Sequence, residues 1–121
     1  MNRQDTAAVF AALGDPVRQR LLDLLAAGPG TASQLHPAVG VTRQAVAQQL
    51  AVLQGAGLVS RQRQGREVLF AVVPAGLEPA REHLDRMGAA WEGRLAAIKR
   101  AAEDDAAGRG LGQERTQDQR P

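Results

Sequence analysis

The sequence predicts a mostly α-helical fold with one small β-hairpin. Apolar residues recur at helical spacing through most of residues 6–57 and again from about residue 79 onward. Between these regions the stretches LVSRQRQ and REVLFAVV flank Gly65, which is typical of two strands joined by a turn. A chain of 121 residues without internal repeats indicates a single domain.

The first two predicted helices are marked by residues that favour helix ends. Residues 6–13 form a short helix that Gly14 closes. Asp15 is a good N-cap, Pro16 suits the first position of a helix, and Gly28 suits the position after its end. The buried stripe of this second helix is Val17, Leu21, Leu24 and Leu25.

A third and a fourth helix follow before the hairpin. Thr31 and Gln34 have the spacing of a capping box, while Pro37 predicts a third helix that is short or kinked. Thr42 can cap the fourth helix, which ends at Gly57 and has one apolar face. That face consists of Val46, Leu50 and Leu53.

A long last helix is predicted from about Pro79. Its apolar stripe consists of Leu84, Met87, Trp91, Leu95, Ile98 and Ala102. A large aromatic residue such as Trp91 on this kind of helix is typical of an anchor in a core or a dimer interface. The sequence then turns polar and glycine-rich, so we predict a domain over residues 1–104 and a disordered tail over residues 105–121.

The composition limits the chemistry available to the chain. The sequence contains no Cys, which excludes disulfides, thiol nucleophiles and thiolate metal ligands. It has no P-loop, and Ser33 near His36 is better explained as two residues of one helix than as a catalytic pair. We therefore predict that the protein is not an enzyme. Without a secretory signal or an apolar run that spans a membrane, a cytoplasmic protein is expected.

The outer face of the fourth helix is made of amides and small residues. Gln44 and Gln48 point away from the buried stripe, and a Gln side chain can pair bidentately with a base edge in the major groove. Ala47 and Ala51 let the helix backbone come close to a partner, and Arg43 can reach a guanine edge or a phosphate. This face indicates contact with a nucleic acid. The alternative is a solvated helix surface, which the three outward residues Gln44, Gln48 and Gln49 would also explain.

Positive charge is concentrated around the hairpin. Residues 41–70 hold four arginines against Glu67 alone, whereas the net charge of the whole chain is +2. Those in the hairpin are Arg61, Arg63 and Arg66, which can lie along a duplex backbone or enter a minor groove. Arg18 and Arg20 on the second helix are interpreted as solvated, with phosphate contact as the alternative. The order of these elements is that of a winged helix-turn-helix.

Three stretches of the sequence resemble the ArsR type of bacterial transcriptional regulator: ALGDPVRQRLLDLL, TASQL and VTRQAVAQQLAVLQGAGLVSRQRQGREVLFAV. The resemblance covers residues 7–100. It implies a homodimer in which the first and last helices pack between subunits and each fourth helix faces DNA. It also implies repression of nearby genes.

The resemblance further implies particular site residues. The DNA-binding positions would be Thr42, Arg43, Gln44, Ala47, Gln48, Gln49, Arg61, Arg63 and Arg66. The dimer interface would comprise Val9, Phe10, Leu84, Met87, Trp91, Leu95 and Ile98. The family often has Ser, Lys and His at positions 47–49, so this chain departs from the family in its individual base contacts while keeping the surface.

No metal site and no cofactor is predicted. Arsenic- and cadmium-sensing members of the family carry a Cys-x-Cys near the third helix, where this chain reads SQLHPAV. Zinc- and nickel-sensing members place His ligands on the last helix, where His83 stands alone and Arg94 replaces a second His. The inducing signal stays open between a small apolar molecule in the dimer interface, a partner protein and no signal at all.

The predicted function is therefore that of a homodimeric, sequence-specific DNA-binding regulator. A repressor that binds an inverted-repeat operator through the fourth helix and the hairpin is the leading form of this prediction. Its partners would be double-stranded DNA and a second copy of the chain, with no membrane. The alternative is a winged-helix protein-interaction module that recognises no operator.

Overall fold

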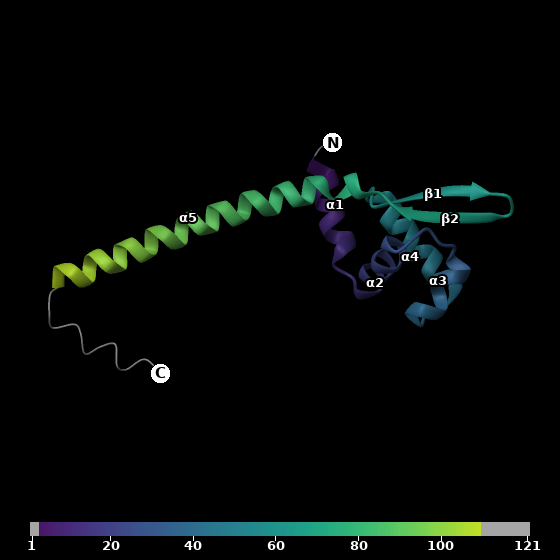
Figure 1. Cartoon of the computed structure of the whole chain (residues 1–121), viewed down its shortest axis with the longest axis horizontal. Coiled ribbons are helices and arrows are strands. Elements are labelled where there is room, and N and C mark those ends of the chain that lie inside the picture. The colour runs from purple at the N-terminus through teal and green to yellow at the C-terminus, as the bar shows by residue number, and fades with distance from the viewer. Residues whose placement is uncertain (1–2, 110–121) are drawn as a thin grey trace. The chain divides into compact units, whose positions relative to one another are not determined.

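The computed structural model describes residues 3–109 of the 121-residue chain. Its elements are α1 (Arg3–Leu13), α2 (Pro16–Ala26), α3 (Ala32–Val39), α4 (Arg43–Gly55), β1 (Val59–Gln64), β2 (Glu67–Val72), the short 3-10 helix η1 (Pro74–Leu77) and α5 (Glu78–Arg109) (Figure 1). The chain divides into two compact units after His83. The first unit holds every element up to the beginning of α5, and the second holds the rest of α5.

The predicted helix starts are confirmed at three helices. Asp15 and Thr42 each accept a hydrogen bond from the backbone N–H three residues further on, both at 3.0 Å. The capping box at α3 is complete, because Thr31 and Gln34 exchange two hydrogen bonds of 3.1 and 2.9 Å. As predicted, α3 is short, with eight residues including Pro37. These caps satisfy N–H groups that have no partner within their own helix.

The last helix is longer than the sequence predicts. It continues to Arg109, so residues 105–109, which the sequence assigns to a tail, are helical. Ala106 and Ala107 favour a helix, and a single Gly108 costs only about 1 kcal/mol and does not end it. The rest of the predicted tail, residues 110–121, lies outside the described residues.

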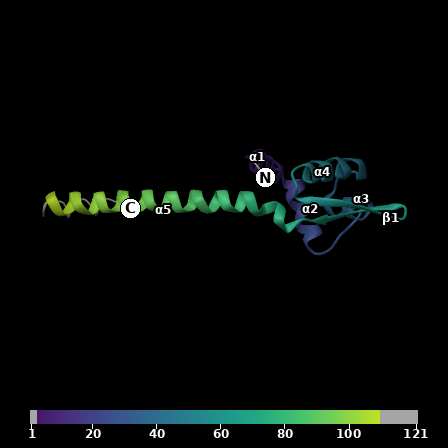
Figure 2. The ribbon, with the colours of Figure 1, turned by 90° about the horizontal axis from the view of Figure 1, so that it is seen from above.

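The predicted hairpin is confirmed as a two-stranded antiparallel sheet. Its register runs from the pair Val59 and Val72 at the base to the pair Gln64 and Glu67 at the turn. Gly65 begins the two-residue turn with a φ of +63°, a conformation that favours glycine in tight hairpins. The turn projects beyond α2, α3 and α4 in both views of the ribbon (Figure 1, Figure 2).

A short bridge fixes the hairpin to the helices. The Gly30 N–H donates to the Phe70 carbonyl at 3.0 Å, and the Phe70 N–H donates to the Gly30 carbonyl at 2.8 Å. The loop between α2 and α3 thus pairs with β2 as a third strand would, for one residue. The sequence contains no alternating run in this loop, so this pairing could not be predicted from it.

The core of the first unit lies between α1–α4 and the base of the hairpin. Its largest fully buried side chains are Val9, Leu21, Leu25, Val46, Leu50 and Leu53. Val9, which was predicted to lie in the dimer interface, belongs to this core instead. Its side chain is only 1% exposed within its own subunit, so it is not available to a second copy. It is buried because one face of α1 packs against α2 and α4 of the same chain.

The second unit is the part of α5 that begins at Leu84. The large apolar residues of its predicted stripe are all exposed: Leu84, Met87, Trp91, Leu95 and Ile98 are 41–64% accessible. Within residues 3–109, no helix is long and apolar enough to cross a membrane. A single helix with an apolar stripe normally needs a partner to bury that stripe.

Candidate nucleic-acid interface

The fourth helix separates a buried face from an amide face. Val46, Leu50 and Leu53 are 0% exposed and fix the helix against the core. Gln44 and Gln48 are exposed on the other side, as predicted. Since the buried stripe fixes the rotation of the helix about its axis, the packing of the opposite face holds these amides outward.

Small residues and an open N-terminus complete this surface of α4. Ala47 and Ala51 are exposed, which leaves room for a partner to approach the helix backbone. Thr42, the N-cap, and Arg43, the first helical residue, are also exposed. The N-terminus of a helix favours anions because its first N–H groups point outward.

A groove of about 500 Å³ separates α4 from the hairpin. It is lined by Thr31, Ala32, Ser33, Arg43, Ala47, Ala51, Gln54, Arg61, Arg66, Glu67, Val68 and Phe70. Three arginines and one glutamate give the groove a net positive charge. The sequence did not predict that the start of α3, Gln54 and the β2 residues Glu67, Val68 and Phe70 would line this groove.

Two arginines of the hairpin, Arg61 and Arg63, lie on the face of β1 that borders this groove. Side chains on a strand alternate between faces, so Arg61 and Arg63 share a face with the buried Val59. Arg61 lies opposite Phe70 in the register, next to the bridge at Gly30. Arg63 lies further toward the turn, and Arg66 is in the turn itself. All three arginines are exposed.

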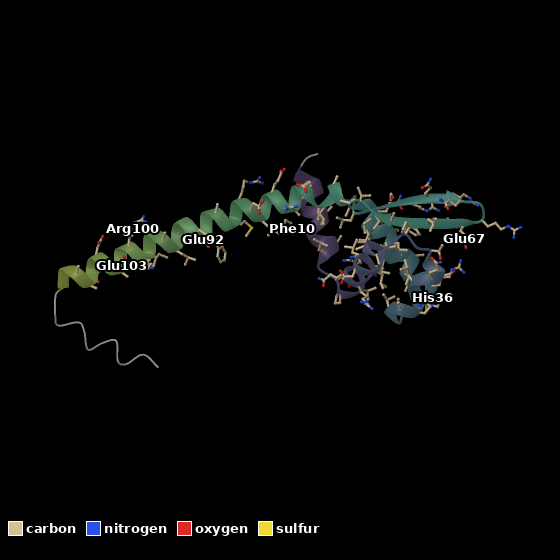
Figure 3. All side chains as sticks on the ribbon, viewed as in Figure 1. Phe10, His36, Glu67, Glu92, Arg100 and Glu103 are labelled. Atoms are coloured by element: carbon tan, nitrogen blue, oxygen red, sulfur yellow. The ribbon has the colours of Figure 1, made fainter. Side chains whose placement is uncertain are left out.

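Glu67 is the one acidic residue of this surface. It lies near the turn of the hairpin, where β2 begins (Figure 3). Its carboxylate lowers the local positive charge and would repel a phosphate close to it. This arrangement favours an anionic partner that contacts the arginines and does not approach the start of β2 at Glu67.

Gln49 and Arg18 do not lie as the sequence suggests. Gln49 is only half-exposed, and its side-chain oxygen accepts a hydrogen bond of 2.7 Å from Arg18. Arg18, interpreted above as a solvated or phosphate-binding residue, is half-buried and also donates to the Ala11 and Ala12 carbonyls. Nothing in the sequence pairs two residues 31 positions apart.

The two histidines lie in ordinary surroundings. The His83 ring packs edge-on against Phe10, with ring centroids 5.6 Å apart. His36 is half-buried near the end of α3 (Figure 3). Over the described part of the chain, no group of three His, Asp or Glu side chains is placed to hold a metal ion.

An exposed amide face on a capped helix, beside a basic hairpin, defines a winged helix-turn-helix protein. Residues 13–62 match the model of a family described as a helix-turn-helix domain. The chain is similar to the HTH-type transcriptional regulator CmtR of Mycobacterium tuberculosis, with 36% identity over 80 residues, or 66% of this chain and 68% of the relative. It is also 30% identical to the transcriptional repressor SdpR of Bacillus subtilis over 53% of this chain and 71% of that protein.

A solved structure gives the same result over more of the chain. The ArsR-like transcriptional regulator from Rhodococcus sp. RHA1 is 41% identical, with a TM-score of 0.71 over 82% of this chain and 93% of that one. The chain belongs to the ArsR family of winged helix-turn-helix transcriptional regulators. It is therefore a DNA-binding regulator of transcription and not an enzyme, as the sequence predicts.

Proposed function

We propose that the protein is a homodimeric repressor that binds an inverted-repeat operator. The observation that supports this most directly is the exposed amide face of α4 beside a groove lined by arginines. In this proposal α4 enters the major groove and the hairpin follows the neighbouring backbone. Since the regulator acts on DNA, we place it in the cytoplasm of a bacterial cell.

Each side chain of the surface has a proposed role. Gln44 and Gln48 read base edges, because an amide offers a donor and an acceptor together. Ala47 contacts a thymine methyl group or allows close approach of the helix. Thr42 and the N-terminus of α4 hold a phosphate, which sets the position of the helix along the duplex.

The arginines supply the affinity that does not depend on sequence. Arg43, Arg61 and Arg66 line the groove and would contact the sugar-phosphate backbone there. Arg63, nearer the turn, would contact the next phosphates or the minor groove. Gln49 is half-exposed and held by Arg18, so we assign it a supporting role and no base contact.

Two copies of the chain are needed to bind an inverted repeat. The exposed stripe of α5 supports pairing with a second copy, because large apolar side chains in a row favour burial. Phe10 is half-exposed and joins this interface in the proposal. The DNA-binding and dimerisation functions then lie within residues 1–104, and the remaining residues are not needed for either.

The proposal is tested by selecting bound duplexes from a random pool. We expect an inverted repeat whose half-sites lie about 34–36 Å apart, one helical turn of DNA. Affinity for this operator should fall steeply as the salt concentration rises. A protein that binds every duplex equally and weakly would instead support the alternative, a winged-helix module that recognises another protein.

A further inference from the structure

The side chain of Arg18 joins three helices of the first unit. Arg18 lies on α2, and its Nε donates to the Ala12 carbonyl at 2.8 Å. Its Nη2 donates to the Ala11 carbonyl at 3.2 Å, also at the end of α1. Its Nη1 donates to Gln49 Oε1, in the middle of α4, at 2.7 Å. One planar guanidinium thus connects α1, α2 and α4.

The contacts with α1 hold this guanidinium in place. The last carbonyls of a helix have no partner within the helix, and a positive charge near them is favourable. Arg18 satisfies two of these carbonyls, and the neighbouring Gln19 side chain donates to a third, that of Leu13, at 2.6 Å. The Arg18 backbone is fixed as well, because its N–H donates to Asp15.

The contact with Gln49 reaches the DNA-facing helix at a sensitive position. Gln49 lies between Leu50, which is fully buried, and Gln48, which is exposed on the amide face. A hydrogen bond at this border resists rotation of α4 about its axis. Bidentate pairing with a base tolerates errors of only about 0.5 Å, so a small rotation would misplace Gln44 and Gln48.

We infer that Arg18 is a positioning residue for operator recognition: anchored on the end of α1, it holds α4 through Gln49 in the orientation that the buried stripe gives the helix, and it does not touch DNA. The inference rests on the proposed function, because it presumes that α4 reads bases. The Arg18 side chain also connects α1, which is part of the proposed dimer interface, to α4 by hydrogen bonds.

A phosphate contact is the competing role for Arg18, and the geometry argues against it. Three of the five N–H donors of the guanidinium are already directed at acceptors within the protein. The side chain is half-buried, whereas Arg43, Arg61 and Arg66 are exposed at the groove. Replacement by Lys distinguishes the phosphate contact from the positioning role. A Lys ammonium group can contact a phosphate, but it cannot donate to both Ala12 and Gln49 as the planar guanidinium does.

The test compares Arg18→Lys and Gln49→Met with the wild type and with Arg20→Ala. Arg20 is an exposed arginine of the same helix and serves as the control for removing a nearby charge. Each protein is titrated with the selected operator and with a scrambled duplex over a range of salt concentrations. We expect both Arg18→Lys and Gln49→Met to bind the operator roughly tenfold more weakly, with little change on the scrambled duplex. General damage to folding would weaken binding to both duplexes alike.

Two further measurements complete the experiment. The double variant Arg18→Lys/Gln49→Met should bind little more weakly than either single variant, because both substitutions break the same hydrogen bond. The salt dependence of Arg18→Ala should match that of the wild type, whereas removing a group that neutralises a phosphate would lower the slope by about 0.9.

The inference is overturned if Arg18→Lys binds the operator like the wild type, if the effects of the two substitutions add, or if the salt slope of Arg18→Ala falls. Failure of the proposed function gives a different result, because the wild type itself would then show no preference for any duplex. Thermal unfolding of each variant establishes that it is folded at the temperature of the titration.

Discussion

At the scale of single residues, the structure depends on a close approach of two backbone segments at Gly76 in η1. A Cβ atom at this position would overlap the carbonyl group of Gly57, the residue that leads from α4 toward β1. Gly57 itself has a φ of +81°, so neither residue is easily replaced.

Gly76→Ala should therefore destabilise the fold, by about 1–3 kcal/mol, because the backbone of η1 or of Gly57 must move to accept the methyl group. Gly55→Ala is the matched control. A Cβ at Gly55 would meet nothing within 4 Å, and its φ is not positive. The control should stabilise the protein by about 0.4–1 kcal/mol through the lower entropy of its unfolded chain. Urea unfolding of all three proteins at one protein concentration measures both effects, and a neutral Gly76→Ala would contradict the close approach.

At the scale of elements, the sequence predicts most of what the structure contains. The caps at Asp15, Thr31 and Thr42 use local side-chain chemistry, so their spacing alone reveals them. The amide face of α4 follows from helical periodicity in the same way. Interactions between elements are not encoded locally, and both the Gly30 bridge and the Arg18 contact with Gln49 were missed for this reason.

The same limit applies to the candidate site. The sequence identifies Gln44 and Gln48 of α4 as exposed correctly, because their exposure follows from helical periodicity. It cannot show that Arg43 and Arg61 line one groove, since this depends on how α4 and β1 pack. The family resemblance also implies Val9 as an interface residue, and it cannot tell which residues of the first helix pack within a subunit and which pack between two.

The hairpin gives a prediction that belongs to the element scale. Arg61→Ala together with Arg63→Ala should weaken binding to operator and scrambled duplexes by similar factors. The salt slope should fall by about 0.9 for each phosphate that the double variant no longer neutralises. Gln62→Ala is the control, because Gln62 lies on the opposite face of β1 and carries no charge. Unchanged DNA affinity in the double variant would count against the hairpin as a DNA-binding element and favour the protein-interaction alternative.

At the scale of the whole molecule, the main question is what covers the apolar stripe of α5. Trp91, Leu95 and Ile98 are 58–64% exposed in a chain whose 44% hydrophobic content is poor in aromatic side chains. A small core of this kind gains stability when two copies bury more apolar surface together. The proposed dimer would therefore also stabilise the fold.

Leu95→Arg should shift the protein toward monomer and abolish tight operator binding, because it places a charge in the interface of the proposed dimer. Ala96→Arg adds the same charge about 100° further round the helix and should leave the dimer intact. Sedimentation at micromolar concentration distinguishes the species. A wild-type chain that sediments as a monomer would contradict the proposal, whereas a chain that ends at residue 104 keeps the whole stripe and should still dimerise.

The pairing of Gly30 with Phe70 bears on how such a regulator could acquire a new target. Both of its hydrogen bonds are made by main-chain atoms, so they do not require particular side chains, and proline at either position would remove a donor. The attachment of the hairpin to the loop between α2 and α3 therefore does not depend on the side chains of the proposed DNA-facing surface. Those side chains can therefore be exchanged while this attachment is kept. A hairpin transferred to another protein would need the loop between α2 and α3 as well, because that loop supplies the paired residue.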